Sequence, residues 1–212
     1  MNKEDLIKYW TESHIITDDN VIEAFIKVPR EDFVQKSDKK HAYSDIPLPI
    51  PAGQTISQPT TVMIMTEILS IKPGMKILEV GSGSGYQAAI LSHLTGGEGK
   101  VITTEIIPEL HEYSKKNLYN YKNVKCVLTD GSIGYRDEAP YDRIIVTAAA
   151  PSVGEKLKKQ LLEEGIMIIP VENESGTGQE MIRITKDENE EITTKNFGDY
   201  LFVPMRGIDG YD

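Results

Sequence analysis

The fold of this chain is decided by one stretch of sequence, KILEVGSGSG at residues 76–85. Its first five residues are typical of a buried β-strand, and the glycines after them predict a tight turn that opens a helix over 86–95. Glycine has no Cβ, so the backbone of such a turn can approach a nucleotide closely. The stretch therefore predicts an α/β fold with a nucleotide-like ligand at the turn.

The spacing of the glycines distinguishes two classes of cofactor. A dinucleotide-binding fingerprint has G-x-G-x-x-G, whereas this chain has G-x-G-x-G, with Tyr86 in place of the third glycine of that fingerprint. Glu79, near the end of the strand, also suits a positively charged ligand better than a pyrophosphate. The pattern EVGSGSG resembles the first motif of the S-adenosylmethionine-dependent methyltransferases, and on this motif alone nicotinamide binding stays open.

Length and charge exclude several classes of protein. The 212 residues suffice for one sizeable α/β core. A net charge of −10 without a basic cluster argues against a nucleic-acid partner, and the single cysteine excludes an internal disulfide and a two-cysteine metal site. There is no apolar run of about 18–20 residues and no signal-peptide pattern. We expect a cytoplasmic protein without a metal or membrane partner, and a monomer by default.

Strand-like and helix-like patterns alternate after residue 76. The predicted strands lie at 76–80, 100–105, 124–129, 142–147 and 165–171, and the predicted helices at about 86–95, 108–121 and 153–163. Near-continuous apolar strands such as IIV at 144–146 are typical of a parallel sheet that is buried on both faces. Alternation over 179–204, around an acidic turn at 187–191, predicts antiparallel strands that include 201–203.

The region before this core predicts a helical extension. Two helices are expected there, the second capped at 17–19 and ended by Pro29, followed by an extended segment over 30–56. SQP at 57–59 predicts the start of a further helix. The fold class is thus a single-domain, Rossmann-like S-adenosylmethionine-dependent methyltransferase, with a mostly parallel sheet, helices on both faces and C-terminal antiparallel strands. Its expected parts are an extension (1–56), a cofactor-binding core (57–172) and a C-terminal hairpin (173–212).

Two more acidic strand ends could anchor an adenosyl cofactor. Glu105 ends the second predicted strand, where a carboxylate can accept both ribose hydroxyl protons. Asp130 and Gly131 follow the third strand, where they could bind the adenine amino group and ring. Singly, Glu105 could be an ordinary surface charge and Asp130–Gly131 a plain turn. Three such strand ends in register favour adenosylmethionine binding.

The nucleic-acid methyltransferases are disfavoured by two further observations. Enzymes that methylate adenine or cytosine amino groups usually carry an Asn/Asp-Pro-Pro-aromatic box after the fourth strand, and this chain has VTAAAP at 146–151. Methylation of cytosine C5 needs a nucleophilic cysteine, but Cys126 falls in mid-strand, where a small buried residue is expected.

One string ahead of the core makes the likeness to a family specific. It is GQTISQP at 53–59, and the chain resembles the protein-L-isoaspartate (D-aspartate) O-methyltransferases over almost its whole length. The other matching stretches are VPREDFV (28–34), AYSD (42–45), EVGSGSGYQAA (79–89), PYDRIIVTAAA (140–150) and FVPMRG (202–207). Two departures are visible: Thr129 replaces the first glycine of a Gly-Asp-Gly triplet, and Thr60–Thr61 replace bulkier residues, which could alter the substrate lip.

The resemblance implies methyl transfer from S-adenosylmethionine to the α-carboxyl of L-isoaspartyl residues in damaged proteins and peptides. S-adenosyl-L-homocysteine is the other product, and whether D-aspartyl residues also react stays open. The methyl ester would cyclise to a succinimide and reopen partly to normal aspartate, which makes the reaction a repair step. The implied cofactor-binding residues are Glu79, Gly81, Ser82, Gly83, Ser84, Gly85, Tyr86, Glu105, Ile106, Asp130, Gly131, Thr147 and Ala148. The implied substrate-binding residues are Gln54, Thr55, Ile56, Ser57 and Val203.

The chemistry does not need a general base. A free α-carboxyl has a pKa of about 3.3–3.7, so the nucleophile is already ionised at neutral pH, and none of the four histidines is given a role. The resemblance makes Ser57 the catalytic-site serine, whose hydroxyl could orient the substrate carboxylate at the start of a helix. Its alternative role is that of a simple N-cap.

Two rival functions remain open at this point. A methyltransferase for small carboxyl or amine substrates would share the fold, but would leave the string at 53–59 unexplained. A cofactor-binding protein without turnover would be expected to lack an anchor, whereas Glu79, Glu105 and Asp130 are all present.

Overall fold

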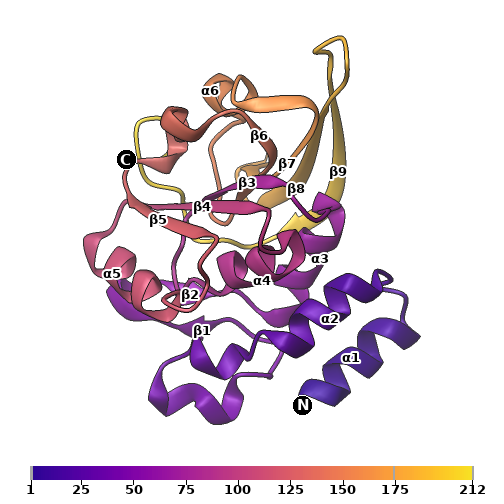
Figure 1. Ribbon diagram of the computed structural model, residues 1–212, viewed down its shortest axis with the longest axis vertical. Coiled ribbons are helices and arrows are strands. Elements are labelled where there is room, and N and C mark those ends of the chain that lie inside the picture. The colour runs from indigo at the N-terminus through magenta and orange to yellow at the C-terminus, as the bar shows by residue number, and fades with distance from the viewer. Residues whose placement is uncertain (1, 174, 212) are drawn as a thin grey trace.

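The computed structural model describes residues 2–173 and 175–211. Within these residues a central sheet of seven strands has the order β5-β4-β3-β6-β7-β8-β9 (Figure 1). Strands β3 to β7 pair in parallel, whereas β8 pairs antiparallel with β7 and β9. The strands span Lys76–Val80 (β3), Lys100–Glu105 (β4), Val124–Leu128 (β5), Tyr141–Val146 (β6), Leu161–Glu172 (β7), Gln179–Lys186 (β8) and Ile192–Tyr200 (β9).

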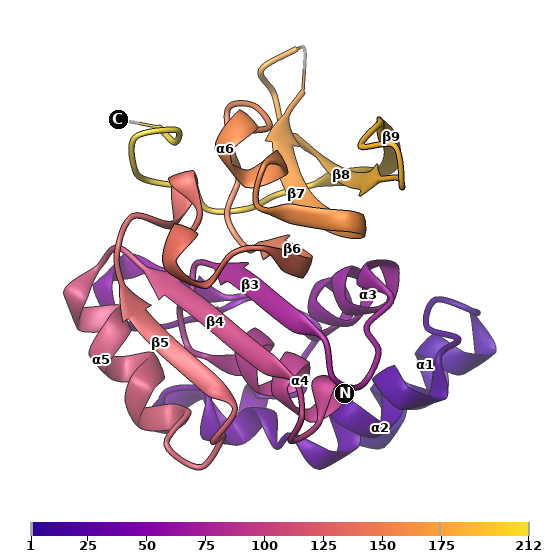
Figure 2. The ribbon, with the colours of Figure 1, turned by 45° about the horizontal axis from the view of Figure 1, so that its top comes forward.

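The two faces of the sheet are covered differently. Figure 2 shows α1 to α5 on one side of the parallel strands and α6 on the other. The helices span Lys3–Glu12 (α1), Asp19–Lys27 (α2), Pro59–Leu69 (α3), Tyr86–Thr95 (α4), Pro108–Asn117 (α5) and Glu155–Lys158 (α6). Side chains alternate between the faces of a strand, so Ile77 belongs to the core under α1 to α5 and its neighbour Leu78 to the core around α6. None of the described helices has the length and apolar character needed to span a bilayer.

The structure confirms the predicted fold class and most of the core. Strands β3 and β4 and helix α4 have the predicted bounds, and β5 and β6 agree within one residue. The turn between β8 and β9 covers 187–191 as predicted. There the Asp187 carboxylate accepts hydrogen bonds from the amides of Asn189 and Glu191, at 2.8 Å each.

The helix predicted over 153–163 was wrong. Only α6 is helical there, and β7 already begins at Leu161, which pairs with Tyr141 of β6. The Tyr141 amide donates to the Gln160 carbonyl at 2.9 Å, so pairing with β6 takes up this backbone. The helix predicted over 108–121 was also too long, because α5 ends at Asn117 and Leu118 turns into the core.

Two expectations about irregular segments need correction. Residues 30–56 form short 3₁₀ helices at Arg30–Asp32, Lys36–His41 and Pro51–Gly53, with a small hairpin of β1 (Leu48–Pro49) and β2 (Thr55–Ile56), rather than a simple extended run. Residues 201–203 lie outside the strands, because β9 ends at Tyr200. The chain turns there to the end of β6, where the Val203 carbonyl accepts the Ala149 amide at 2.8 Å.

Candidate active site

The carboxyl ends of β3, β4 and β6 border a cavity of about 640 Å³, the first cavity. Loops diverge from this end of a parallel sheet, which makes it the usual place for a ligand. Its described lining residues are Gln54, Thr55, Val80, Gly81, Gly83, Thr104, Glu105, Ile106, Ile107, Leu110, Gly131, Ser132, Thr147, Ala148, Val203, Pro204, Met205 and Arg206. Ten of these are among the residues that the sequence predicted for the site.

The glycine turn is shaped by its contacts with two neighbouring strand ends. The amides of Gly81 and Ser82 both donate to the Thr104 carbonyl, at 2.9 and 3.0 Å. Gly81 has a φ of 95°, and a Cβ on it would lie 2.6 Å from the Thr147 hydroxyl oxygen. Only glycine fits at this position without displacing Thr147. The turn therefore presents bare backbone to the first cavity, as the motif predicted.

Glu105 is held beside the first cavity by its neighbours. Its Oε1 accepts the amides of Ile106 and Ile107, both at 3.0 Å, and its Oε2 accepts the Gly83 amide at 3.0 Å. The Ser82 hydroxyl is 3.4 Å from Oε2. These contacts fix the carboxylate and join the end of β4 to the glycine turn. Glu105 thus presents a hydrogen-bond acceptor in a fixed position.

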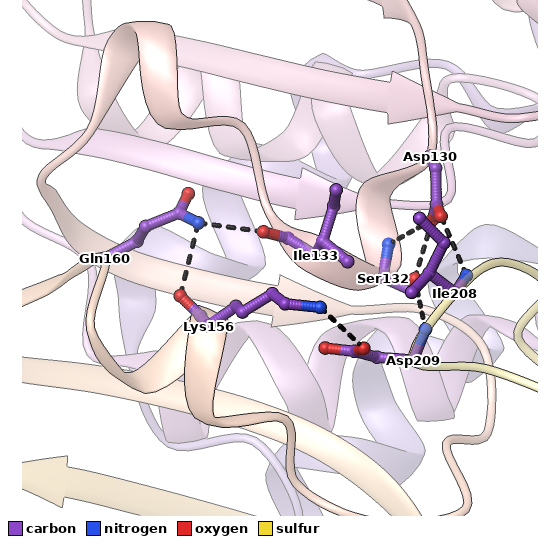
Figure 3. A network of polar contacts seen from close by, with 7 residues as sticks. All are labelled: Asp130, Ser132, Ile133, Lys156, Gln160, Ile208 and Asp209. Carbon is purple, nitrogen blue, oxygen red and sulfur yellow. Dashed lines mark hydrogen bonds and ion pairs between the residues drawn. The ribbon is translucent and has the colours of Figure 1, made fainter.

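Asp130 is engaged with a distant part of the chain. Its Oδ1 accepts the amide and the hydroxyl of Ser132, at 2.9 and 2.6 Å, and its Oδ2 accepts the Ile208 amide at 2.8 Å (Figure 3). Gly131 and Ser132 line the first cavity, whereas Asp130 does not. A Cβ on Gly131 would lie 2.2 Å from the Thr104 hydroxyl oxygen, so this turn can pack against β4 only with glycine.

Glu79 and Tyr86 face a different space. They line a second cavity of about 430 Å³ together with Ser57, Ser82 and Ser84. Glu79 is fully buried, and neither of its carboxylate oxygens has a hydrogen-bond partner among the described residues. Burial raises the pKa of Glu79 to about 8. The Glu79 carboxyl, an acidic group without a hydrogen-bond partner among the described residues, therefore lines the same cavity as the glycine turn.

Tyr86 packs against the N-terminal layer of the protein, which consists of residues 2–45. Its ring packs on Phe33, with 5.4 Å between centroids, and the Arg30 guanidinium lies 5.0 Å from its centre. Arg30 is fully buried, donates to the carbonyls of Ala42 (2.8 Å) and Ser57 (2.6 Å), and so ties that layer to the string at 53–59. Burial lowers the pKa of Arg30 to about 10, so its side chain stays charged at neutral pH.

Ser57 lies where two cavities adjoin. It lines the second cavity and also a third cavity of about 670 Å³. The described lining of the third cavity is Pro47, Thr55, Ser57, Gln58, Thr61, Thr147, Leu201, Phe202 and Val203. Thr55 and Thr147 line all three cavities. The string at 53–59 and the segment after β9 therefore meet beside the glycine turn.

The N-cap alternative for Ser57 was wrong. Helix α3 begins at Pro59 with Gln58 at the N-cap position, and no side chain there caps the helix. Instead Asp45 accepts the Thr60 amide at 2.9 Å and the Thr60 hydroxyl at 2.7 Å. The Asp45 carboxylate therefore already occupies the helix start that was expected to attract a substrate anion.

The structure separates the two threonines of the expected substrate lip and adds lining residues that the sequence did not single out. Thr60 is buried and accepts the Trp10 indole N–H at 2.8 Å, so it is not part of a substrate lip, whereas Thr61 lines the third cavity. Ser132 and Leu110 were missed as lining residues of the first cavity, whereas Pro204, Met205 and Arg206, which also line it, lie in the stretch FVPMRG that the resemblance had marked. Ser132 directly follows Asp130–Gly131, a signal that could have found it. Of the predicted residues, Gly85 and Asp130 line none of these three cavities.

The comparisons with known proteins agree on one family. A family model described as protein-L-isoaspartate(D-aspartate) O-methyltransferase (PCMT) matches residues 1–209. The chain is 48% identical to the protein-L-isoaspartate O-methyltransferase of Methanosarcina mazei over 198 residues, which cover 92% of this chain and 80% of that protein. Identity to the protein of the same name from Pyrococcus horikoshii is 44%, over 100% of this chain and 99% of that one.

Solved structures give the same result. A Plasmodium falciparum β-aspartate methyltransferase (PCMT) in complex with S-adenosyl-L-homocysteine has a TM-score of 0.85 and 27% identity, covering 97% of this chain and 99% of that chain. A structure named protein-L-isoaspartate O-methyltransferase has a TM-score of 0.87 and 29% identity, covering 98% of this chain and 67% of that chain. With matches of sequence and of fold over nearly all its length, the chain belongs to the protein-L-isoaspartate (D-aspartate) O-methyltransferase family.

Proposed function

We propose that this chain transfers a methyl group from S-adenosylmethionine to the α-carboxylate of L-isoaspartyl residues in proteins and peptides. The observation that carries the proposal is the junction of two cavities. The first cavity contains the glycine turn and Glu105, the third contains Ser57 and its neighbours, and both are lined by Thr55, Thr147 and Val203. A donor in one cavity and an acceptor in the other would meet at this junction.

The residues of the first cavity fit an adenosyl cofactor. Glu105 is fixed beside this cavity, where its Oε2 can accept a ribose hydroxyl, and Gly131 and Ser132 line the part of the cavity proposed for the adenine ring. Asp130 lies outside the lining of this cavity and acts on it indirectly, because its carboxylate binds Ser132, which lines the cavity. When bound, S-adenosylmethionine supplies a methyl group on a positively charged sulfur. The buried carboxyl of Glu79 and the backbone of 81–84 would hold its amino-acid end.

The third cavity suits a peptide carboxylate. The Ser57 hydroxyl can donate a hydrogen bond to the carboxylate and so orient one oxygen toward the junction. Arg30 fixes the Ser57 backbone through the carbonyl bond of 2.6 Å. Val203 and Phe202 line the same cavity and exclude water from the nucleophile. Since the carboxylate is already ionised, positioning at about 3–3.5 Å from the methyl group is the main task of the site.

Two further observations support a protein or peptide substrate rather than a nucleic acid. Burial raises the pKa of the Cys126 thiol to about 11, so it is protonated and unsuited to nucleophilic methyl transfer. The net charge of −10 would repel a phosphate backbone. We take the chain to be a cytoplasmic monomer with one domain, in which 1–56 supports the substrate side, 57–172 the cofactor side and 173–212 the outer wall.

The proposal is tested with a matched pair of peptides that differ only in an isoaspartyl or an aspartyl linkage. The purified protein is incubated with methyl-labelled S-adenosylmethionine and each peptide. We expect base-labile label on the isoaspartyl peptide only. Label on both peptides would contradict the proposed acceptor, and label on neither, with S-adenosylhomocysteine still bound, would contradict the proposed reaction while leaving the cofactor site intact.

A further inference from the structure

The outer wall of the first cavity is made by a segment that lies outside the strands and is anchored by the buried side chain of Met205. Residues 203–206 line the cavity but follow the last strand of the sheet. Two backbone bonds hold the segment to the end of β6: the Ala149 amide donates to Val203 at 2.8 Å, and the Met205 amide donates to Ala149 at 2.7 Å. Beyond Met205 the position of the wall depends on the residues that come next.

Those residues, 207–209, are fixed by the turn that follows β5. The Ile208 amide donates to Asp130 at 2.8 Å, and the Asp209 amide donates to the Ser132 hydroxyl oxygen at 3.0 Å (Figure 3). The Ile208 side chain is 74% exposed, so apolar packing does not hold this stretch. Polar contacts with Asp130 and Ser132 therefore determine where it lies. We call residues 207–209 the clasp.

The clasp reaches a second element through its charge. The Asp209 carboxylate pairs with the Lys156 ammonium at 2.8 Å. The Lys156 carbonyl accepts the Gln160 amide group at 3.2 Å, and the same group donates to the Ile133 carbonyl at 2.9 Å (Figure 3). Helix α6 and the turn after β5 thus form one polar network around the clasp.

Gly207 fits this network only because it lacks a side chain. Its φ is 126°, a conformation that other residues rarely adopt, and a Cβ on it would lie 2.1 Å from Oδ1 of Asp130 and 2.7 Å from the Ser132 hydroxyl oxygen. Asp130 cannot move aside freely, because Ser132 and Ile208 hold its carboxylate. Any side chain at 207 would therefore break the bonds that fix the clasp.

From these contacts we propose that the clasp sets the affinity of the first cavity for its adenosyl ligand. By binding Asp130 and Ser132, it holds residues 204–206, which line the first cavity but not the third, as the outer wall against the Gly131–Ser132 turn. This inference rests on the proposed function for the identity of the ligand. It makes Gly207 and Asp209 positioning residues, although neither lines the cavity. Since linked equilibria are reciprocal, ligand binding must in turn stabilise the clasp.

The test compares two glycine variants by titration calorimetry with S-adenosylhomocysteine. Gly207→Ala places a Cβ against Asp130, whereas Gly198→Ala is the matched control, because Gly198 also has a positive φ (100°) but has no atom within 4 Å of its Cβ position. We expect Gly207→Ala to raise the Kd by about tenfold or more and Gly198→Ala to change it by less than about twofold. Equal Kd values for the two variants would overturn the proposal.

Two further measurements separate positioning from general destabilisation. At saturating S-adenosylmethionine, the KM of Gly207→Ala for an isoaspartyl peptide should stay within about twofold of the wild type, because the Ala149 amide holds Val203 at the third cavity independently of the clasp. A rise of the KM in step with the Kd would contradict a role confined to the first cavity. In the wild type, S-adenosylhomocysteine should slow hydrogen exchange at the Ile208 and Asp209 amides, and unchanged exchange would contradict the coupling. If the wild type bound no S-adenosylhomocysteine, the proposed function itself would fail, which is a distinguishable result.

Discussion

Glu79 is a buried acidic residue whose ionisation is costly for the fold. Its carboxyl is fully buried without a hydrogen-bond partner among the described residues, and burial raises its pKa from 4.5 to about 8. Between these two values the folded chain binds a proton that the unfolded chain releases. The free energy of unfolding therefore falls as the pH rises through this range, by up to about 1.4 kcal/mol per pH unit.

Glu79→Gln should remove this dependence, because glutamine has the shape of the neutral acid and does not titrate. Relative to the wild type, the variant should gain stability as the pH rises from about 5 to about 8. Urea unfolding at several pH values in this range measures the difference. Parallel stability curves for variant and wild type would show that Glu79 does not titrate in this way.

At the residue scale, the sequence was informative where partners are close along the chain. Oε1 of Glu105 receives its hydrogen bonds from the next two residues, Ile106 and Ile107, and the place of Glu105 beside the first cavity was predicted. Asp130 and Ser57 have partners that are far away in sequence, Ile208 for the first and Arg30 for the second. Such contacts depend on the tertiary fold, so no local pattern could reveal them.

At the scale of elements, the start of α3 is anchored to two segments that precede it in the chain. Asp45 accepts both the amide and the hydroxyl of Thr60, and Trp10 of α1 donates to the same hydroxyl oxygen. These bonds connect α1 and the segment before β1 to the first turn of α3. Ser57 lies directly ahead of that turn, so its position depends on this contact.

Asp45→Ala should lower the free energy of unfolding by about 1–2 kcal/mol, as expected for the loss of a helix cap. It should also raise the KM for an isoaspartyl peptide, because the loop that carries Ser57 loses its anchor. The matched control is Asp18→Ala, which removes the N-cap of α2 and its bond to the Asn20 amide. Urea unfolding and peptide kinetics check both variants, and an equal change in KM would rule out the specific role of Asp45.

The elements themselves were predictable where the pattern is local and strong. Strands β3 and β4 and helix α4 have apolar patterns and glycine boundaries that mark them along the chain. The helix expected over 153–163 failed because Leu157 and Leu161 have helical spacing, while the pairing of Leu161 with Tyr141 makes that residue part of β7. Long-range pairing outweighed local periodicity in this segment.

At the scale of the whole molecule, three parts of the chain converge on one junction. The parallel sheet carries the glycine turn and Glu105, and the segment after β9 forms the outer wall. Arg30 of the N-terminal layer holds Ser57 through a hydrogen bond to its carbonyl. The family resemblance implied that residues 54–57 and Val203 are parts of the site. That they meet at Thr55 and Thr147 is a property of the fold.

The central claim is that donor and acceptor occupy separate, adjoining cavities, and the most direct measurement compares Ser57→Ala with Glu105→Gln. For each variant, kcat/KM for an isoaspartyl peptide is measured beside the Kd for S-adenosylhomocysteine. Ser57→Ala should lower kcat/KM by about tenfold or more with less than about twofold change in Kd, whereas Glu105→Gln should raise the Kd by about tenfold. Equal losses of kcat/KM and of S-adenosylhomocysteine affinity in Ser57→Ala would contradict the account.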